Sequence, residues 1–245
     1  MNSVIELLQS HRSIRKFTDK KIAEAELAEL IKAGQAAATS SFLQGTTVIR
    51  VTKPDIRDEF VELAGNQPYI ASCAEFLVFC ADLRRSSNCC DMHGAQATEG
   101  MTEQFIIATV DVALMAQNVV VAAESMGLGI CYIGGIRNNP KRATELLEIP
   151  RGVYPVFGLC LGYPAQDPEV KPRLPLSVVM KTDVYDESED EKTIREYDEH
   201  VREYYRTRTG GKKSMCWSEQ MSGLLGKESR PHMKGFLEGQ GFEMK

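Results

Sequence analysis

The segment from residue 103 to residue 126 places the strongest constraint on the fold. It is predicted to form the longest helix of the chain, and its side chains are apolar on nearly all sides. Such a helix needs cover on several faces, from a protein core or from a membrane. Asp111, Gln117 and Asn118 interrupt the apolar run, and no cationic anchors flank it. We therefore expect a buried helix in a globular core and no membrane span.

Shorter segments on both sides of this helix alternate between two kinds of pattern. Strands are predicted at residues 47–52, 76–81, 130–133 and 154–161, and further helices at 3–9, 23–38, 54–63, 140–147, 191–206 and 230–240. This alternation indicates an α/β or α+β fold, and the local pattern does not set the direction of the strands. We expect a single domain over residues 1–245, with polar excursions around 84–102 and 186–220.

Charge and cysteine usage exclude several classes of protein. The net charge is −5, which argues against a general nucleic-acid binder. The seven cysteines are odd in number and include no Cys-x-x-Cys pair, so we expect reduced thiols without structural zinc. The four histidines are scattered, and no metal site is predicted. The first residues lack the pattern of a signal peptide, and a cytoplasmic location is expected.

The familiar short motifs of nucleotide-binding and hydrolytic enzymes are missing from the sequence. Gly127-x-Gly129 suggests a dinucleotide-binding loop, but Tyr132 occupies the place of the third glycine. The pair also follows a predicted helix, whereas the dinucleotide motif follows a strand. The sequence contains no P-loop, no Gly-x-Ser-x-Gly and no His-Glu-x-x-His.

A basic stretch near the N-terminus is the first candidate binding element. The sequence HRSIRKF at residues 11–17 holds a histidine, a serine and three cations. If the stretch is helical, Arg12 and Arg15 lie on one face. Two guanidinium groups on one face suit a phosphate or a polarised carbonyl. The alternative is a solvent-exposed basic turn, and this stretch alone does not decide between them.

Four further polar loops flank predicted buried elements, so each has access to a common site. They lie at residues 39–41, 67–69, 132–135 and 171–173. Together with the basic stretch, they supply cations for a phosphate, amide and hydroxyl groups for ring heteroatoms, and glycines for close backbone approach. This set of groups suits a flavin better than a metal ion or a covalent nucleophile.

The order of these motifs along the chain resembles the nitroreductase superfamily, in its NADPH-linked branch of oxygen-insensitive nitroreductases and NADPH-flavin oxidoreductases. The resemblance covers residues 3–243 and rests on nine strings in register: HRSIRKFTD, TSS, GNQPY, VDVALMAQN, AAESMGLGICYIGGIRN, FGLCLGYP, KPRLP, YYRTRTGGK and ESRP. It implies an α+β nitroreductase-like fold, in which helices flank a central, mostly antiparallel sheet. It also implies a homodimer in which an excursion of each subunit embraces its partner.

The resemblance further implies one FMN per subunit at the dimer interface. The residues that it assigns to the cofactor are His11, Arg12, Ser13, Ile14, Arg15, Thr39, Ser40, Ser41, Gln67, Pro68, Tyr69, Tyr132, Ile133, Gly134, Gly135, Lys171, Pro172 and Arg173. Thr39 departs from the family, which usually has serine there. Arg208, and less strongly Arg230, match positions that bind NADPH. No catalytic side chain is assigned, because the flavin carries the chemistry.

The activity implied by the resemblance is hydride transfer from NADPH through FMN to nitroaromatics, quinones or free flavin, by a ping-pong mechanism. The expected partners are a second copy of the chain and small-molecule electron acceptors. Two alternatives stay open: a flavin-binding or redox-sensing protein with little turnover, and a flavin-independent scaffold. Nitroreductase and flavin reductase activities are not separated, because they share the same site motifs.

Overall fold

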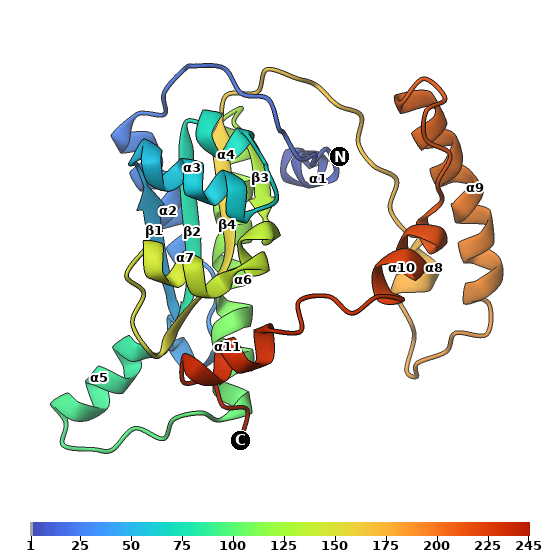
Figure 1. The fold of residues 1–245 in the computed structure, drawn as a ribbon. Coiled ribbons are helices and arrows are strands. Elements are labelled where there is room, and N and C mark those ends of the chain that lie inside the picture. Colours follow the sequence, from blue (N-terminus) through green and yellow to red (C-terminus); the bar gives the residue numbers. More distant parts are fainter. Residues whose placement is uncertain (1) are drawn as a thin grey trace. The chain divides into compact units, whose positions relative to one another are not determined.

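The computed structural model describes residues 2–245 and contains two compact units (Figure 1). Unit 1 joins the chain up to Pro168 to the C-terminal segment His232–Lys245, and unit 2 is Glu169–Pro231. The single domain expected from the sequence stays a prediction.

An antiparallel sheet of four strands forms the centre of unit 1. The strands are β1 (Thr46–Val51), β2 (Glu75–Asp82), β3 (Gly129–Ile133) and β4 (Val153–Gly162), in the order β1-β2-β4-β3. All three neighbouring pairs are antiparallel. β2 and β4 occupy the middle of the sheet, which explains their nearly continuous apolar sequences. The α+β fold class is confirmed.

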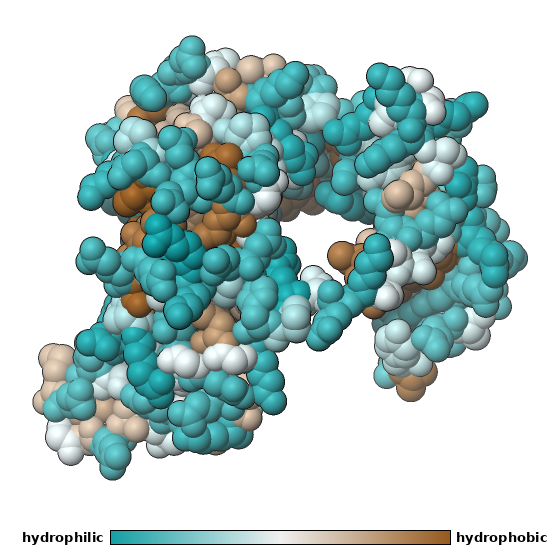
Figure 2. Space-filling model, viewed as in Figure 1, coloured by the Kyte–Doolittle hydropathy of each residue, from teal (hydrophilic) through white to brown (hydrophobic). Residues whose placement is uncertain are grey.

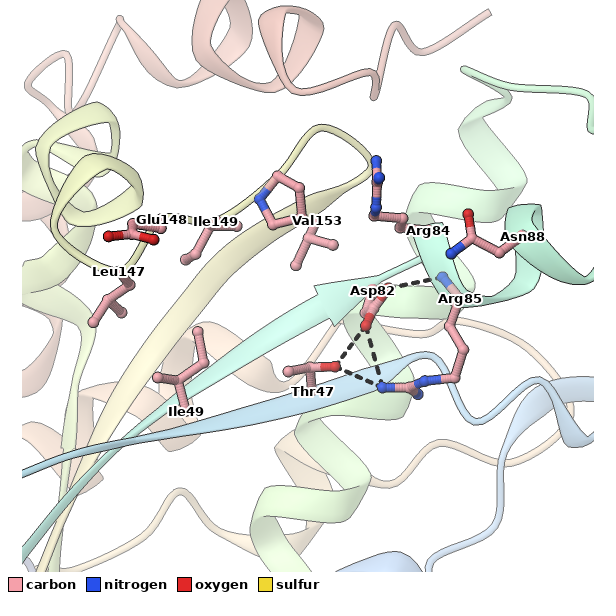
Figure 3. Close-up of a pocket in the computed structure, with 11 residues that line it drawn as sticks. Thr47, Ile49, Asp82, Arg84, Arg85, Asn88, Leu147, Glu148, Ile149 and Val153 are labelled. Atoms are coloured by element: carbon pink, nitrogen blue, oxygen red, sulfur yellow. Dashed lines mark hydrogen bonds and ion pairs between the residues drawn. The ribbon is translucent and has the colours of Figure 1, made fainter.

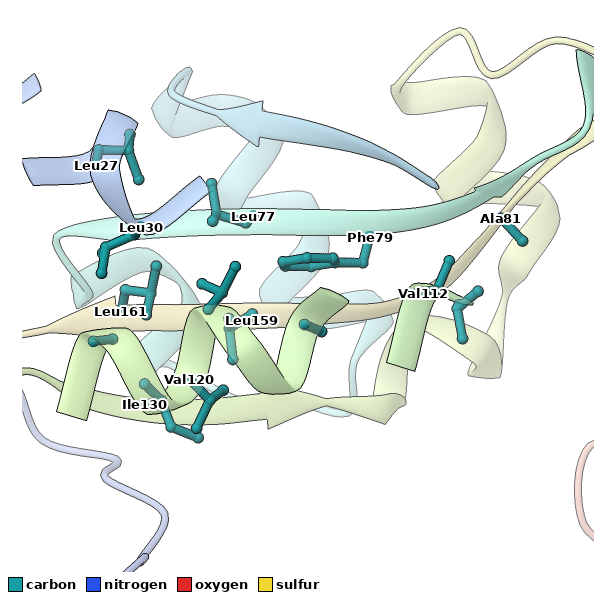
Figure 4. Close-up of a cluster of buried hydrophobic side chains, with 14 of the residues drawn as sticks. Leu27, Leu30, Leu77, Phe79, Ala81, Val112, Val120, Ile130, Leu159 and Leu161 are labelled. Atoms are coloured by element: carbon teal, nitrogen blue, oxygen red, sulfur yellow. The ribbon is translucent and has the colours of Figure 1, made fainter. Parts of the chain in front are cut away.

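Helices cover both faces of this sheet. The helices of unit 1 are α1 (Ser3–Gln9), α2 (Glu24–Gln35), α3 (Pro54–Leu63), α4 (Tyr69–Ser72), α5 (Arg84–Met92), α6 (Thr102–Ser125), α7 (Pro140–Leu146) and α11 (Met233–Gly239), with the 3-10 turns η1 (Ser40–Phe42) and η2 (Gly134–Asn138). Successive side chains of β2 point to opposite faces. Leu77 and Phe79 pack with α2 and α6 (Figure 4), whereas Phe76 and Val78 pack with α3, α4 and α7.

The long helix α6 lies against the sheet through one face only. The buried residues of its core face include Val112, Ala116, Val119, Val120 and Ala123. The opposite face leaves Ile106, Val110 and Leu114 exposed at helical spacing. The sequence predicted that α6 is buried on several sides, and within one chain this holds for its core face but not for the opposite face. Among residues 2–245, α6 is also the one helix whose length and composition would allow it to cross a membrane.

Two segments differ from the prediction made from the sequence. Residues 84–102, expected to be irregular, begin with the nine-residue helix α5. The Asp82 carboxylate accepts the backbone N–H of Arg85 at 3.2 Å, so it satisfies a donor of the first helical turn. In unit 2, the helix expected at residues 191–206 extends two residues further, to Arg208.

Unit 2 consists of three helices, two of which were not predicted. They are α8 (Leu176–Val179), α9 (Asp190–Arg208) and α10 (Trp217–Leu225). The buried Asp198 of α9 accepts the backbone N–H of Ser218 at 2.9 Å, within the first turn of α10. This carboxylate therefore provides a cap from a distant part of the sequence, which local pattern does not reveal.

The face of the molecule in Figure 2 is predominantly hydrophilic, with apolar side chains gathered in small groups. Exposed apolar residues also lie on α1, namely Val4, Ile5 and Leu8. The exposed apolar residues of α1 and α6 are grouped along their helices. Single exposed apolar residues are common on soluble proteins, but groups of them usually mark a surface that another molecule covers.

Gly158 in β4 tests how tightly the central sheet is packed. A Cβ atom at this position would lie 2.6 Å from Cε2 of Phe76 and 3.2 Å from Cβ of Ile133. We expect Gly158→Ala to lower the free energy of unfolding by about 1–3 kcal/mol, because the buried ring has little room to move. Urea denaturation measures this change. Gly235→Ala in α11 is the control: its Cβ meets no atom within 4 Å, and it should be neutral or stabilising.

Candidate functional site

The basic stretch at residues 11–17 is extended. The hypothesis that it forms a helix with Arg12 and Arg15 on one face is therefore wrong. Ser13 forms a parallel bridge with Ile130 of β3, and the Ile14 N–H donates to the Ile130 carbonyl at 2.8 Å. The Ile14 side chain is buried beside Gly129, where a Cβ atom would lie 2.6 Å from Ile14 Cγ1. Tertiary pairing with the sheet edge therefore fixes the stretch and anchors its polar neighbours.

His11 is held by a carboxylate that the sequence analysis did not identify. Its Nδ1 lies 2.7 Å from Oε1 of Glu124, in the last turns of α6. Glu124 is largely buried, with 14% of its side chain exposed. The interaction at Nδ1 orients the imidazole, so the second ring nitrogen, Nε2, points away from Glu124. No local signal in the sequence distinguishes Glu124 from the other acids of the chain.

Arg12 has one buried donor that lacks a partner. Its guanidinium donates to the Ser10 carbonyl at 3.0 Å and to the carboxylate of Asp167. Its Nε is buried and, among the described residues, is the one buried side-chain polar atom without a hydrogen bond. An unpaired buried donor is costly, so this nitrogen indicates that an acceptor from a ligand belongs beside it.

Arg15 connects the basic stretch to the loop at residues 67–69. Its side chain interacts with the phenol of Tyr69, whose hydroxyl donates to the Gln67 side-chain carbonyl. Burial raises the pKa of Tyr69, as does the nearby Cys131, while Arg15 opposes the rise. The Gln67 amide in turn donates to the Ala64 carbonyl at 2.6 Å. These contacts give the polar groups of this loop fixed orientations.

The segment from Tyr132 to Gly135 lies beside both groups. At Gly135 a Cβ atom would be 2.5 Å from the Ala64 carbonyl oxygen and 2.9 Å from the Gln67 amide nitrogen, so only glycine fits. Burial raises the pKa of Tyr132 to about 12, and the charge of Glu124 adds to the effect. The structure therefore brings together three of the expected loops: 11–15, 67–69 and 132–135.

The hydroxyl stretch Thr39–Ser41 lies at the other end of the sheet. The backbone N–H of Ser40 donates to Oδ1 of Asp111 at 3.2 Å. Along α6, Asp111 is separated from Glu124, which contacts His11, by about 20 Å at 1.5 Å per residue. In Figure 1, α4 and α5 lie at opposite ends of β2, the strand that they precede and follow. This stretch therefore does not join the other loops within one chain.

The remaining expected residues belong to unit 2. Lys171, Pro172 and Arg173 line a cavity of about 330 Å³ with aromatic side chains of α9 and α10. The Tyr197 hydroxyl donates to the Pro172 carbonyl at 2.9 Å. Tyr204, which also lines this cavity, accepts from the Arg208 guanidinium at 2.6 Å. Lys171–Arg173 and the Arg208 contact are thus neighbours within unit 2.

Arg230 has an unusual backbone conformation near the end of unit 2. Its φ is +54°, in the left-handed region that non-glycine residues seldom adopt. It lies next to Pro231, the last residue of the unit.

Two cavities of unit 1 lie at the α5 end of the sheet. The first, about 350 Å³, is lined by residues of β1, α5 and the 147–153 segment (Figure 3). Its Asp82 carboxylate is already bonded to Thr47 and Arg85, and the cavity contains no residue expected from the sequence. The second, about 500 Å³, has Ser40 and Ser41 in its wall. Within residues 2–245, no three His, Cys, Asp or Glu side chains form a metal-binding group.

Comparison with known proteins gives the family. Residues 8–163 match the profile of the nitroreductase family, and residues 171–245 match that of the nitroreductase family C-terminal domain. The chain is 45% identical over 242 residues to an oxygen-insensitive NADPH nitroreductase of Salmonella typhimurium, with 99% of each chain covered. It is 43% identical over 246 residues to an FMN reductase (NADPH) of Bacillus subtilis, again with 99% of each covered.

Solved structures agree with this result over nearly the whole chain. The NADPH:FMN oxidoreductase from Vibrio harveyi, complexed with NAD⁺, superimposes with a TM-score of 0.90 at 43% identity and 98% coverage of both chains. NfrA1 of B. megaterium gives a TM-score of 0.95 at 42% identity, covering 98% of this chain and 99% of the other. The resemblance expected from the nine sequence motifs is confirmed: the chain belongs to the nitroreductase family.

Proposed function

We propose that the chain is an FMN-dependent oxidoreductase that takes hydride from NADPH and reduces small acceptors. The observation that carries the proposal is the convergence of residues 11–15, 67–69 and 132–135, together with the unpaired, buried Nε of Arg12 in the first of these segments. The names of the relatives, which are NADPH nitroreductase, FMN reductase and NADPH-flavin oxidoreductase, support the same cofactor and co-substrate.

The polar groups of this convergence fit the two ends of FMN. His11 and Arg12 supply donors for the phosphate, and Arg12 Nε is a donor that gains a partner when the group binds. Arg15, Gln67 and Tyr69 supply donors and acceptors for the heteroatoms of a flavin ring. The close backbone packing at Gly135 allows the 132–135 segment to face the ring edge without an intervening side chain.

Bound FMN supplies the redox chemistry, because it accepts hydride from NADPH and passes it to the acceptor. The protein's task is to bind, to orient and to provide charge. Lys171 and Arg173 are proposed to hold the cofactor as well, where their positive charges would stabilise negative charge on it. We propose a ping-pong mechanism, in which NADP⁺ leaves the pocket before the acceptor enters it.

The placement of Thr39–Ser41 supports a site shared between two chains. These residues lie about 20 Å of helix away from the other loops, so the flavin that they contact belongs to a second copy. The exposed apolar stripe of Ile106, Val110 and Leu114 supplies a surface for that copy. We therefore propose a homodimer with FMN at its interface, in the cytoplasm.

The proposed acceptors are nitroaromatics, quinones and free flavin. Parallel steady-state measurements with NADPH and nitrofurazone, a quinone or free FMN rank them. A redox-sensing protein with little turnover is the competing function. Rapid-mixing experiments separate the two, because an enzyme's bound flavin is bleached by NADPH within a turnover and recovers when an acceptor is added.

The first prediction concerns the basic stretch. The double variant Arg12→Ala/Arg15→Ala should bind FMN at least about tenfold more weakly, because each charge-assisted hydrogen bond contributes roughly 1.5–3 kcal/mol. Titration of the apoprotein with FMN, followed by flavin fluorescence, measures the affinity. Arg142→Ala is the control, since Arg142 pairs with Glu59 on the surface. Wild-type affinity in the double variant would contradict the assignment of the flavin site.

The second prediction concerns the shared site. We expect the wild-type protein to sediment as a dimer at micromolar concentration, and Val110→Asp to sediment as a monomer. Val110 is 49% exposed in the single chain, so a charge there is tolerated by the monomer and is desolvated in a dimer. The monomeric variant should also lose FMN. A stable, flavin-loaded monomer would rule out the shared site.

The third prediction concerns the choice of nucleotide. Arg208→Ala should raise KM for NADPH by about ten- to a hundredfold, the loss expected for one charge-assisted bond to the 2′-phosphate. KM for NADH should hardly change, because NADH lacks that phosphate. The ratio of kcat/KM for the two nucleotides is the measurement. Arg206→Ala provides a matched control, because Arg206 pairs with Glu203 in the same helical turn. If the ratio of kcat/KM for NADPH to kcat/KM for NADH is unchanged in Arg208→Ala, Arg208 is a surface charge that does not contact the 2′-phosphate.

A further inference from the structure

Asp111 is a buried carboxylate in the middle of the most apolar helix of the chain. Only 1% of its surface is exposed. Its two oxygens accept from two different backbone donors, Oδ1 from the N–H of Ser40 at 3.2 Å and Oδ2 from the N–H of Gly45 at 3.4 Å. A buried carboxylate is costly unless it is hydrogen-bonded, so these two contacts explain how the group is tolerated.

The two donors are the first and last residues of a short loop with an uncommon backbone. Ser41, Phe42 and Gln44 have φ values of +50°, +59° and +54°, which lie in the left-handed region. Non-glycine residues adopt this region at a cost, and several within one loop persist only when the surrounding structure holds them. The Phe42 side chain is 81% exposed, so burial of this ring does not supply the restraint.

The carboxylate of Asp111 supplies such a restraint. By binding both ends of the loop, it fixes the distance between Ser40 and Gly45 and forces the intervening residues outward. Gly45 lies against α6, since a Cβ atom there would make an ordinary contact of 3.6 Å with the backbone of Ala108, about one turn before Asp111. The Leu43 N–H closes the loop on the Ser40 carbonyl at 2.9 Å.

We propose that Asp111 is a positioning residue for the flavin site: it holds the Ser40–Gly45 loop in the conformation that meets the FMN of a second copy. The inference rests on the proposed function, which assigns the hydroxyls of this loop to that flavin. The same helix then contributes to two flavin sites, because Glu124 of α6 contacts His11, which belongs to the site of its own chain. Asp111 acts through the loop and does not touch the cofactor.

Asp111→Asn tests the clamp, by which we mean the two hydrogen bonds from the Asp111 carboxylate to the backbone N–H groups of Ser40 and Gly45. An amide has nearly the same size as the carboxylate, but only its oxygen accepts a hydrogen bond, so one of the two loop donors loses its partner. Asn118→Ala is the matched control on the same helix. It removes a 3.3 Å hydrogen bond from α6 to the Ala33 carbonyl of α2 and leaves the loop untouched.

The first measurement is hydrogen exchange of the Ser40 and Gly45 amides in the purified full-length protein. At least one of them should exchange about tenfold faster in Asp111→Asn, and both should keep the wild-type rate in Asn118→Ala. This readout reports the clamp directly and does not require that flavin bind. Unchanged exchange in Asp111→Asn would overturn the proposed clamp, whatever the protein's activity.

The second measurement is FMN binding to the apoprotein, with the absorption spectrum of the bound flavin. Asp111→Asn should weaken FMN binding by about tenfold and shift the visible flavin band, because the loop hydroxyls move. Asn118→Ala should match the wild type in both. Faster exchange with wild-type affinity and spectrum would make Asp111 a purely structural residue and overturn its role at the site. If the wild-type protein binds no FMN, the proposed function is refuted. The hydrogen-exchange rates would still show whether Asp111 restrains the loop.

Discussion

The packing of α6 against one face of the antiparallel sheet is the interaction on which the rest of unit 1 depends. The buried side chains of this helix pack against β2 and β4. Gly34 lets α2 lie close to α6, because a Cβ atom at Gly34 would be only 2.6 Å from Cγ2 of Val119. The polar exceptions along the helix are not defects of the core. Asp111 binds the backbone of the Ser40–Gly45 loop and Glu124 binds His11, so a helix that packs through apolar side chains also sets the distance between these two polar segments.

Elements that depend on their own pattern could be predicted from the sequence. β2 and β4 follow from continuous apolar runs, and the residues of α3 were predicted as observed. Elements that depend on distant partners could not. Asp82 starts α5 in a segment without apolar periodicity, and pairing with Ile130 holds residues 11–17 extended despite a helical spacing of arginines. In both cases tertiary contacts override the local preference.

The candidate site was predictable in its residues and less so in its geometry. Polar loops next to buried elements identified 11–15, 67–69 and 132–135, which meet in space. The same reasoning included Thr39–Ser41, because sequence does not say at which end of a sheet a loop lies. That loop precedes β1, whereas the 67–69 loop precedes β2, and antiparallel neighbours begin at opposite ends: Thr46 pairs with Ala81, near the end of β2. Glu124 had no local signal at all.

The separation of the two loop groups has a genetic consequence in the proposed dimer. In that dimer, each flavin site would take its basic stretch from one chain and its hydroxyl loop from the other. In a mixed dimer, one chain can be defective at Arg12 and the other at Ser41. One of its sites then carries both defects, and the other carries none. Two inactive alleles can therefore complement each other, although neither homodimer has an intact site.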